Sequence, residues 1–301
     1  MRIGLVSNAI GTGSLEDVIE EAREAAADGF HTFWSSQIFG FDALTALALV
    51  GREVPGIELG TAVVPTYPRH PMMLAQQALT VQAATGNRLC LGLGLSHQMV
   101  VEYLWGLSFE KPLRHIREYL SVLMPLLAGE SVNVEGETMT VRGAIGVAGA
   151  ERPSVVIAAL GEQMLRLSGT VADGTATWCT GPKTLADLTI PTIKQAAADA
   201  GRPSPRISAA LPVCVTDDVD GVKAVVAELL AVYNTLPSYR TMMDREGVAG
   251  PADLTIAGTE AEVRDRVADL KSIGVTDFNA VIVGRNADER GRTNAVLAEF
   301  L

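Results

Sequence analysis

The sequence of 301 residues contains little cysteine and no long apolar run. Its three cysteines, Cys90, Cys179 and Cys214, lie far apart within apolar segments, which indicates buried thiols rather than a disulfide framework or a C-x-x-C metal or redox pair. No apolar run approaches the ~20 residues that span a bilayer. The chain begins MRIGLVSN, which is typical of a strand and a polar turn rather than of a signal peptide. We therefore expect a cytoplasmic protein without a membrane segment.

Positive charge is also scarce. The chain has 24 Lys and Arg against 35 Asp and Glu, a formal net charge of -11. Because bound cations drive association with a phosphate backbone, this balance argues against nucleic acid as a partner. A small anionic ligand would have to be held by local backbone N–H groups or by a few well-placed cations. Hydrophobic residues, in contrast, make up 48% of the chain, enough for a large core.

Short β-branched runs alternate with longer segments of helical period, and this pattern occurs eight times. The expected strands are residues 2–7, 31–36, 57–64, 88–95, 155–160, 175–179, 207–215 and 277–283. Parallel strands joined by helices need cover on both faces, and eight such units can close without leaving an exposed edge. The sequence therefore predicts an α/β fold of the (β/α)8 TIM-barrel type. A doubly wound open sheet is the alternative, because closure cannot be read from periodicity.

Two stretches interrupt this rhythm. Residues 131–153, after the fourth helix, alternate in polarity around Glu135 and Gly136, which predicts a small hairpin followed by a Gly/Ala-rich loop. Residues 217–257, after the seventh strand, are expected to contain a helix and then a loop through Pro237. We interpret both stretches as insertions in a single barrel domain that spans residues 1–301.

Helix starts are marked by two capping boxes, in which a hydroxyl and a carboxylate three residues later satisfy free N–H groups reciprocally. Ser14 and Asp17 form the first, and Thr259 and Glu262 form the second. Both precede apolar residues at helical spacing, so each predicts a helix that packs against the sheet.

In a barrel of this type, the active site is built from the C-terminal ends of the strands and the loops that follow them. These positions are Ser7–Asn8, Ser35–Gln37, Ala62–Pro65, Leu95–His97, Ala158–Gly161, Trp178–Gly181, Leu211 and Val283–Gly284. They contain no H-x-H pair or carboxylate cluster, so no metal site is predicted, and none of the five lysines lies inside a strand to form a Schiff base. Small, amide, aromatic and apolar side chains of this kind suit a large planar cofactor that carries its own reactivity.

Two glycine-containing segments lie among these positions. LGLGLSH, residues 91–97, superficially suggests a dinucleotide fingerprint, but His97 occupies the third glycine position. In AALGEQ, residues 158–163, small residues end the fifth strand and Gly161 opens a helix, whose free N–H groups can receive a phosphate. The alternative is that Gly161 only forms a tight turn between strand and helix.

Several segments together resemble the bacterial-luciferase-like flavin and deazaflavin oxidoreductases. They are LGTAVVP at residues 59–65, RHP at 69–71, NRLCLGLGLSH at 87–97 and VIAALGEQ at 156–163. The resemblance extends over essentially the whole chain, from MRIGLVSN to the last strand, TDFNAVIV. Within the family, the sequence is most similar to actinobacterial members that use the deazaflavin coenzyme F420 rather than FMN.

The resemblance implies a set of coenzyme-binding residues. A non-prolyl cis peptide bond at Ala62–Val63 would support the back of the coenzyme ring. The coenzyme phosphate or its linker would lie against Ala159, Leu160, Gly161 and Glu162. The remaining expected contacts are Ser36, Leu95, Ser96, His97 and Trp178. Trp178 at the end of the sixth strand would wall a substrate cavity, although core packing is at least an equal alternative for a residue of this size.

Two positions depart from related deazaflavin dehydrogenases and are the predicted catalytic residues. Gln37 stands where those enzymes have a catalytic histidine, and its amide can form hydrogen bonds but cannot act as a base. His97 stands where they have a carboxylate, and it can donate to the ring or relay a proton near neutral pH. The alternative for His97 is that it only holds its loop. These departures argue against alcohol oxidation and favour a reductase.

We therefore predict a cytoplasmic F420-dependent oxidoreductase that transfers a hydride between the coenzyme and a small organic substrate, as a reductase. The first alternative is an FMN-dependent monooxygenase of the same family. The second is a non-catalytic flavin- or deazaflavin-binding protein, suggested by Gln37 in place of the expected base. The resemblance also implies a homodimer, and neither a metal, a nucleic acid nor a membrane is expected as a partner.

Overall fold

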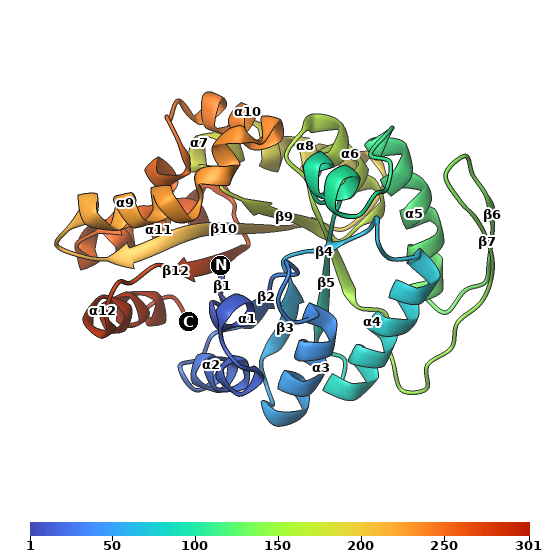
Figure 1. Cartoon of the computed structure of the whole chain (residues 1–301), viewed down its shortest axis with the longest axis horizontal. Helices are drawn as coiled ribbons and strands as arrows, with labels where there is room; N and C mark the ends of the chain where they lie inside the picture. The colour runs from blue at the N-terminus through green and yellow to red at the C-terminus, as the bar shows by residue number, and fades with distance from the viewer.

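Parallel strands form a closed ring in the computed structural model of the chain, which describes residues 1–301 (Figure 1). The ring consists of β1 (Arg2–Val6), β2 (Thr32–Ser35), β3 (Glu58–Thr61), β5 (Leu89–Gly94), β8 (Ser154–Ala158), β9 (Gly174–Trp178), β10 (Arg206–Val215) and β12 (Asp277–Ile282). Pairing of β9 with β10 and of β12 with β1 closes the circle. The predicted TIM barrel is confirmed, and the open sheet is wrong because no barrel strand is left with a free edge.

Helices cover the outside of the ring (Figure 1). They are α2 (Leu15–Ala27), α3 (Ala43–Glu53), α4 (Pro71–Thr85), α5 (Pro112–Leu127), α6 (Glu162–Val171), α8 (Ile190–Asp199), α11 (Glu260–Ile273) and α12 (Ala287–Ala298). Their apolar faces and the outward side chains of the strands form one core cluster of 58 buried residues. The capping boxes predicted at Ser14 and Thr259 are both present, at the starts of α2 and α11. None of these helices has the length and apolar character needed to cross a membrane.

The two interruptions of the barrel rhythm are ordered elements. β6 (Val132–Glu135) and β7 (Thr140–Gly143) form the predicted antiparallel hairpin, which projects beyond α5 (Figure 1). The second interruption contains α9 (Val219–Leu229), the 3₁₀ helix η3 (Ala231–Thr235), α10 (Pro237–Glu246), the 3₁₀ turn η4 (Pro251–Leu254) and β11 (Ile256–Gly258). The loop predicted through Pro237 is wrong. Pro237 begins α10, since the first turn of a helix does not need the N–H that proline lacks.

Short elements fill the connections at the ends of the barrel strands. They are α1 (Ala9–Thr12), β4 (Val64–Pro65), the π-helical turn η1 (Val100–Leu104), α7 (Pro182–Thr184) and the π-helical turn η2 (Leu185–Thr189). The three cysteines are free and buried, as predicted. Burial raises the pKa of the Cys90 thiol to about 12, so this thiol is not a nucleophile at neutral pH.

Side chains that point into the barrel form layers. At the N-terminal end, Arg206 of β10 forms ion pairs with Glu58 of β3 and Asp277 of β12, and Arg2 of β1 also contacts both carboxylates. Trp34 of β2 is fully buried, and its ring lies against Gly4 of β1 and Gly60 of β3 inside the barrel. The barrel is therefore closed below by an ionic layer and a large ring, and its inner space lies at the C-terminal ends of the strands.

Candidate active site

The C-terminal end of the barrel has an apolar floor, which we define as Ala62, Ala158, Ala176 and Val281. Ala62, Ala176 and Val281 pack on the inner cluster that includes Trp34, and Ala158 is in register with Ala176. All four floor residues remain partly exposed although they belong to the barrel wall. Small side chains at these positions leave a space above the Trp34 layer, so this end of the barrel can receive a flat ring.

One edge of the floor is shaped by a break in the third strand. The sequence predicts a continuous strand over residues 57–64, but β3 ends at Thr61 and β4 resumes at Val64, and the Ala62–Val63 peptide bond between them is cis. The predicted cis bond is therefore confirmed. The hydroxyl of Thr61 donates to the carbonyl of Gly92 and accepts the Gly92 N–H, both at 2.8 Å, which ties the break to β5.

The glycines of LGLGLSH have a packing role. A methyl group at Gly92 would overlap the carbonyl oxygen of Thr61, and one at Gly94 would lie 2.5 Å from Cγ2 of Val63. Both positions therefore need glycine so that the segment around Ala62–Val63 can approach β5 closely. Close packing therefore explains the glycines of LGLGLSH, and a dinucleotide-binding role is not needed to explain them.

His97 follows β5 through Ser96, which has a left-handed backbone conformation with φ of 63°. The His97 ring is half-buried and makes no hydrogen bond to another protein group. Its nearest aromatic neighbours are Tyr239, with ring centroids 5.8 Å apart, and Tyr233, with centroids 6.4 Å apart. Burial lowers the pKa of His97, so the ring is neutral at pH 7 and both nitrogens are free to exchange a proton with a ligand.

Tyr233 and Tyr239 are site residues that the sequence reasoning missed. They lie on η3 and α10, and Tyr233 also contacts Trp178 at the end of β9, with centroids 6.2 Å apart. The two tyrosine rings meet edge to face at 4.7 Å. We call Trp178, Tyr233 and Tyr239 the aromatic wall. The signal in the sequence was the presence of two tyrosines close to a proline in a chain with only 5% aromatic residues.

The amide oxygen of Gln37 holds the start of α3. It accepts the backbone N–H of Ala43 at 2.8 Å and lies 3.4 Å from a guanidinium nitrogen of Arg69. Arg69 also pairs with Asp42, the residue whose carboxylate caps α3. The structure thus gives Gln37 a positioning role at the loop after β2, and its catalytic role stays a prediction.

The start of α6 offers unpaired backbone donors. Gly161 occupies the N-cap position and supplies no side-chain acceptor, so the first N–H groups of the helix lack a protein partner. The surroundings of Gly161 are open, and the carboxylate of Glu162 is turned to Arg166, 2.6 Å away. An anionic group fits this position because the N–H groups and the helix dipole both favour negative charge.

The remaining predicted coenzyme-binding residues also lie at strand ends. Ser36 follows β2, and Leu95 and Ser96 follow β5, and all three are partly exposed. Ala159 is buried and Leu160 is partly exposed between β8 and α6. The structure therefore brings every predicted binding residue to the C-terminal side of the barrel. No group of three or more His, Cys, Asp or Glu side chains is placed to hold a metal ion.

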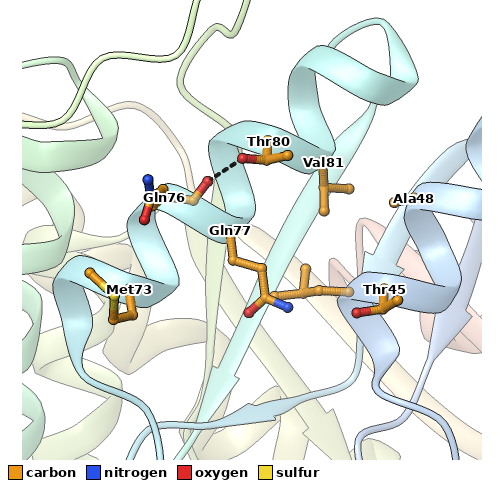
Figure 2. Close-up of a pocket in the computed structure, with 8 residues that line it drawn as sticks. Thr45, Ala48, Met73, Gln76, Gln77, Thr80 and Val81 are labelled. Atoms are coloured by element: carbon orange, nitrogen blue, oxygen red, sulfur yellow. Dashed lines mark hydrogen bonds between the residues drawn. The ribbon is translucent and has the colours of Figure 1, made fainter.

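A groove of about 370 Å³ on the outside of the molecule is separate from this site. Figure 2 shows that it lies between α3 and α4, with Gln77 and Thr45 facing each other across it. Its lining is Leu44, Thr45, Ala48, Met73, Gln76, Gln77, Thr80 and Val81. These side chains include no acid, base or cation, so the groove supplies no chemistry to the barrel end.

Comparison with known proteins identifies the family. The family described as luciferase-like monooxygenase matches residues 3–277. A 5,10-methylenetetrahydromethanopterin reductase of Methanolobus tindarius is 26% identical, over 86% of this chain and 88% of that protein. A putative coenzyme F420-dependent oxidoreductase of Mycobacterium tuberculosis is 30% identical, over 77% of this chain and 72% of that protein.

A solved structure agrees with the barrel. The coenzyme F420-dependent tetrahydromethanopterin reductase of Methanopyrus kandleri superposes with a TM-score of 0.81, covering 98% of this chain and 97% of that one at 20% identity. The barrel with its aromatic and small-residue rim is thus that of a flavin- or deazaflavin-type oxidoreductase. The chain belongs to the luciferase-like monooxygenase family, in which F420 or a flavin is the typical cofactor.

Proposed function

We propose that the protein is an F420-dependent oxidoreductase that acts as a reductase on a small organic substrate. The observation that carries the proposal is the open apolar floor at the C-terminal end of the barrel, with the unpaired N–H groups of α6 beside it. A floor of this kind suits the face of a planar ring, and the helix start suits a phosphate. The F420-dependent relatives named above support the choice of coenzyme.

Each part of the site then has a separate task. Ala62 and Ala158 would support the coenzyme ring, and Gly161 with the first turn of α6 would bind its phosphate. When bound, the coenzyme supplies hydride transfer at its ring carbon C5. The chain contributes orientation, a largely apolar pocket and one proton-exchanging group, His97. Because the net charge is -11, binding of an anionic coenzyme must depend on these local donors rather than on the field of the whole protein.

Titration of the purified protein with oxidised F420 and, separately, with FMN tests the proposal. Coenzyme fluorescence and the thermal midpoint are the readouts. We expect F420 to bind and to raise the midpoint, and FMN to have little effect. Binding of FMN alone would replace the proposal by an FMN-dependent monooxygenase, and binding of neither would overturn it. F420 binding without turnover over a panel of enones and imines would identify a non-catalytic binding protein.

Gly161→Asp is expected to weaken F420 binding by about tenfold or more. The new carboxylate would cap the N–H groups of α6 and repel a phosphate, which is the loss of at least one charge-assisted hydrogen bond. The position is open, with φ of -85°, so an aspartate fits there and stability should be unchanged or slightly raised. The measurement is the F420 dissociation constant together with the denaturation midpoint.

Gly161→Ala is the matched control, because alanine fits the same open position without an acceptor or a charge. It should bind F420 within about threefold of the parent protein, since the helix N–H groups remain free. Equal F420 affinity in the aspartate and alanine variants would exclude the start of α6 as the phosphate site.

His97→Asn is expected to lower turnover by about 100-fold while F420 affinity changes little, as is typical when a proton-transferring side chain is removed. Burial lowers the pKa of His97, and only the protonated ring can act as an acid. In the parent protein, therefore, turnover should rise as the pH falls below the ordinary range of an imidazole, and the variant should lose this dependence. The measurement is the rate at which the substrate panel oxidises reduced F420, from pH 5 to 8, in the parent protein and the variant. The same pH profile in both proteins would refute this role of His97.

A further inference from the structure

The segment between β10 and β11 covers one side of the barrel end. It contributes Tyr233 and Tyr239, which meet Trp178 and His97 in a continuous set of edge-to-face contacts with centroids 4.7 to 6.4 Å apart. All four rings remain partly exposed. The aromatic wall therefore combines residues from two distant parts of the chain beside the predicted proton donor.

A carboxylate fixes this wall to the barrel. Glu246, in the last turn of α10, accepts the backbone N–H groups of Lys183 and Thr184 at 3.1 and 2.8 Å, and also the Thr184 hydroxyl at 2.8 Å. These donors belong to α7, which follows Trp178 closely, and α10 lies beside α7 in the fold (Figure 1). A methyl group at Gly181 would overlap the Glu246 side chain, so the two segments are in close contact. The wall is thus held in place rather than formed by a free loop.

The wall is uncharged. Burial raises the pKa of Tyr239 well above its usual value and raises that of Tyr233, so both hydroxyls stay protonated at neutral pH. Arg240, next to Tyr239 in sequence, is engaged by Asp244 and by the carbonyls of Val248 and Ala249. The Arg240 guanidinium and the Glu246 carboxylate are therefore already paired with protein groups. Such a surface favours an uncharged ligand with a ring face.

We propose that the aromatic wall is the substrate-binding side of the site and selects an uncharged substrate whose reducible bond is conjugated to a planar ring. This inference rests on the proposed function, because it assigns the apolar floor to the coenzyme and the wall to the substrate. Edge-to-face contacts with Trp178, Tyr233 and Tyr239 favour an aromatic ring over a saturated ring of similar area. His97, at the edge of the wall, then lies beside the conjugated bond.

Two probes that differ only in the ring test this selectivity. They are 4-phenylbut-3-en-2-one and 4-cyclohexylbut-3-en-2-one, which share the enone and have similar apolar size, but only the first has an aromatic ring, conjugated to the enone. Dissociation constants are measured by NMR titration of each probe with the protein, with and without saturating F420. We expect the phenyl probe to bind about fivefold or more tightly, the discrimination that one or two aromatic pairs supply.

Variants then locate the preference. Tyr233→Leu and Tyr239→Leu should each reduce the ratio of the two dissociation constants to below about twofold, and Tyr239→Phe should retain it because the ring remains. Tyr103→Leu is the control, since Tyr103 lies in η1, is 84% exposed and is not part of the wall. Equal binding of the two probes to the parent protein overturns the inference without any variant, as does a preference that both leucine variants retain.

The same samples separate this inference from the proposed function. If F420 fails to bind but the phenyl preference depends on Tyr233 and Tyr239, the wall is a binding site and the coenzyme assignment is wrong. If F420 binds and the probes bind equally, the coenzyme assignment stands and the wall is only packing.

Discussion

Gly92→Ala is expected to lower the free energy of unfolding by about 3 kcal/mol or more and to abolish F420 binding. The added methyl group would overlap the carbonyl oxygen of Thr61 and lie 3.1 Å from a methyl carbon of Val63. Both atoms belong to the segment from the end of β3 to the start of β4, which packs against β5. Thr61 is held there by two hydrogen bonds to Gly92 itself. The conflict cannot be relieved by rotating a side chain, because the closest atom is backbone. Relief requires a shift of Ala62, which is part of the apolar floor.

The measurements are chemical denaturation and F420 titration on the same preparation. Gly291→Ala is the control, because a methyl group at Gly291 meets nothing within 4 Å and the residue lies inside α12. Alanine stabilises a helix interior relative to glycine by roughly 0.5–1 kcal/mol, so this control should be neutral or slightly more stable and should bind F420 normally. A Gly92→Ala protein with unchanged stability and coenzyme affinity would show that β5 and the Ala62–Val63 segment do not need this close approach.

The barrel could be predicted because the sequence features that indicate its strands and helices are local. Most strands contain β-branched residues in a short run, and each helix has a periodic apolar face. Ser14 and Thr259 begin capping boxes that involve residues only three positions away. Closure of the sheet is not local, since it depends on pairing of β9 with β10 and of β12 with β1. Eight repeats made closure the better prediction, but the pairing itself could be established only by the structure.

The site was predicted less completely, for a physical reason that differs from residue to residue. Ala62 and Val63 were found through the resemblance to a family, whereas nothing in the sequence shows that Gly92 serves their packing. The tyrosines of the aromatic wall were missed because their position depends on the contact of Glu246 with Thr184, 62 residues earlier in the chain. Gln37 was assigned by position alone, and its bond to the Ala43 N–H could not be foreseen from periodicity.

Arg206→Met is expected to lower the free energy of unfolding by about 3 kcal/mol without changing F420 affinity. The Arg206 side chain is 19% exposed and lies between Glu58 and the Asp277 carboxylate, which is 3% exposed. Methionine preserves most of the apolar stem but leaves the buried Asp277 carboxylate with only one, more distant cation, Arg2, 3.7 Å away. Because the ionic layer closes the N-terminal end of the barrel, the opposite end should keep its coenzyme-binding geometry.

Two further variants test whether the loss of stability comes from the buried Asp277 charge. Adding Asp277→Asn to the Arg206→Met protein should recover part of the lost stability, because the penalty arises from the unpaired buried charge rather than from a missing attraction. Arg264→Met is the surface control: Arg264 pairs with Glu299, both side chains are at least 40% exposed, and exposed ion pairs contribute only about 0–1 kcal/mol. Urea denaturation of the four proteins gives the comparison. Equal losses of unfolding free energy in Arg206→Met and Arg264→Met would mean that the ionic layer is solvated like a surface pair. A further loss on adding Asp277→Asn would mean that the carboxylate stabilises the barrel through its remaining contacts with Arg2 and the Thr276 hydroxyl.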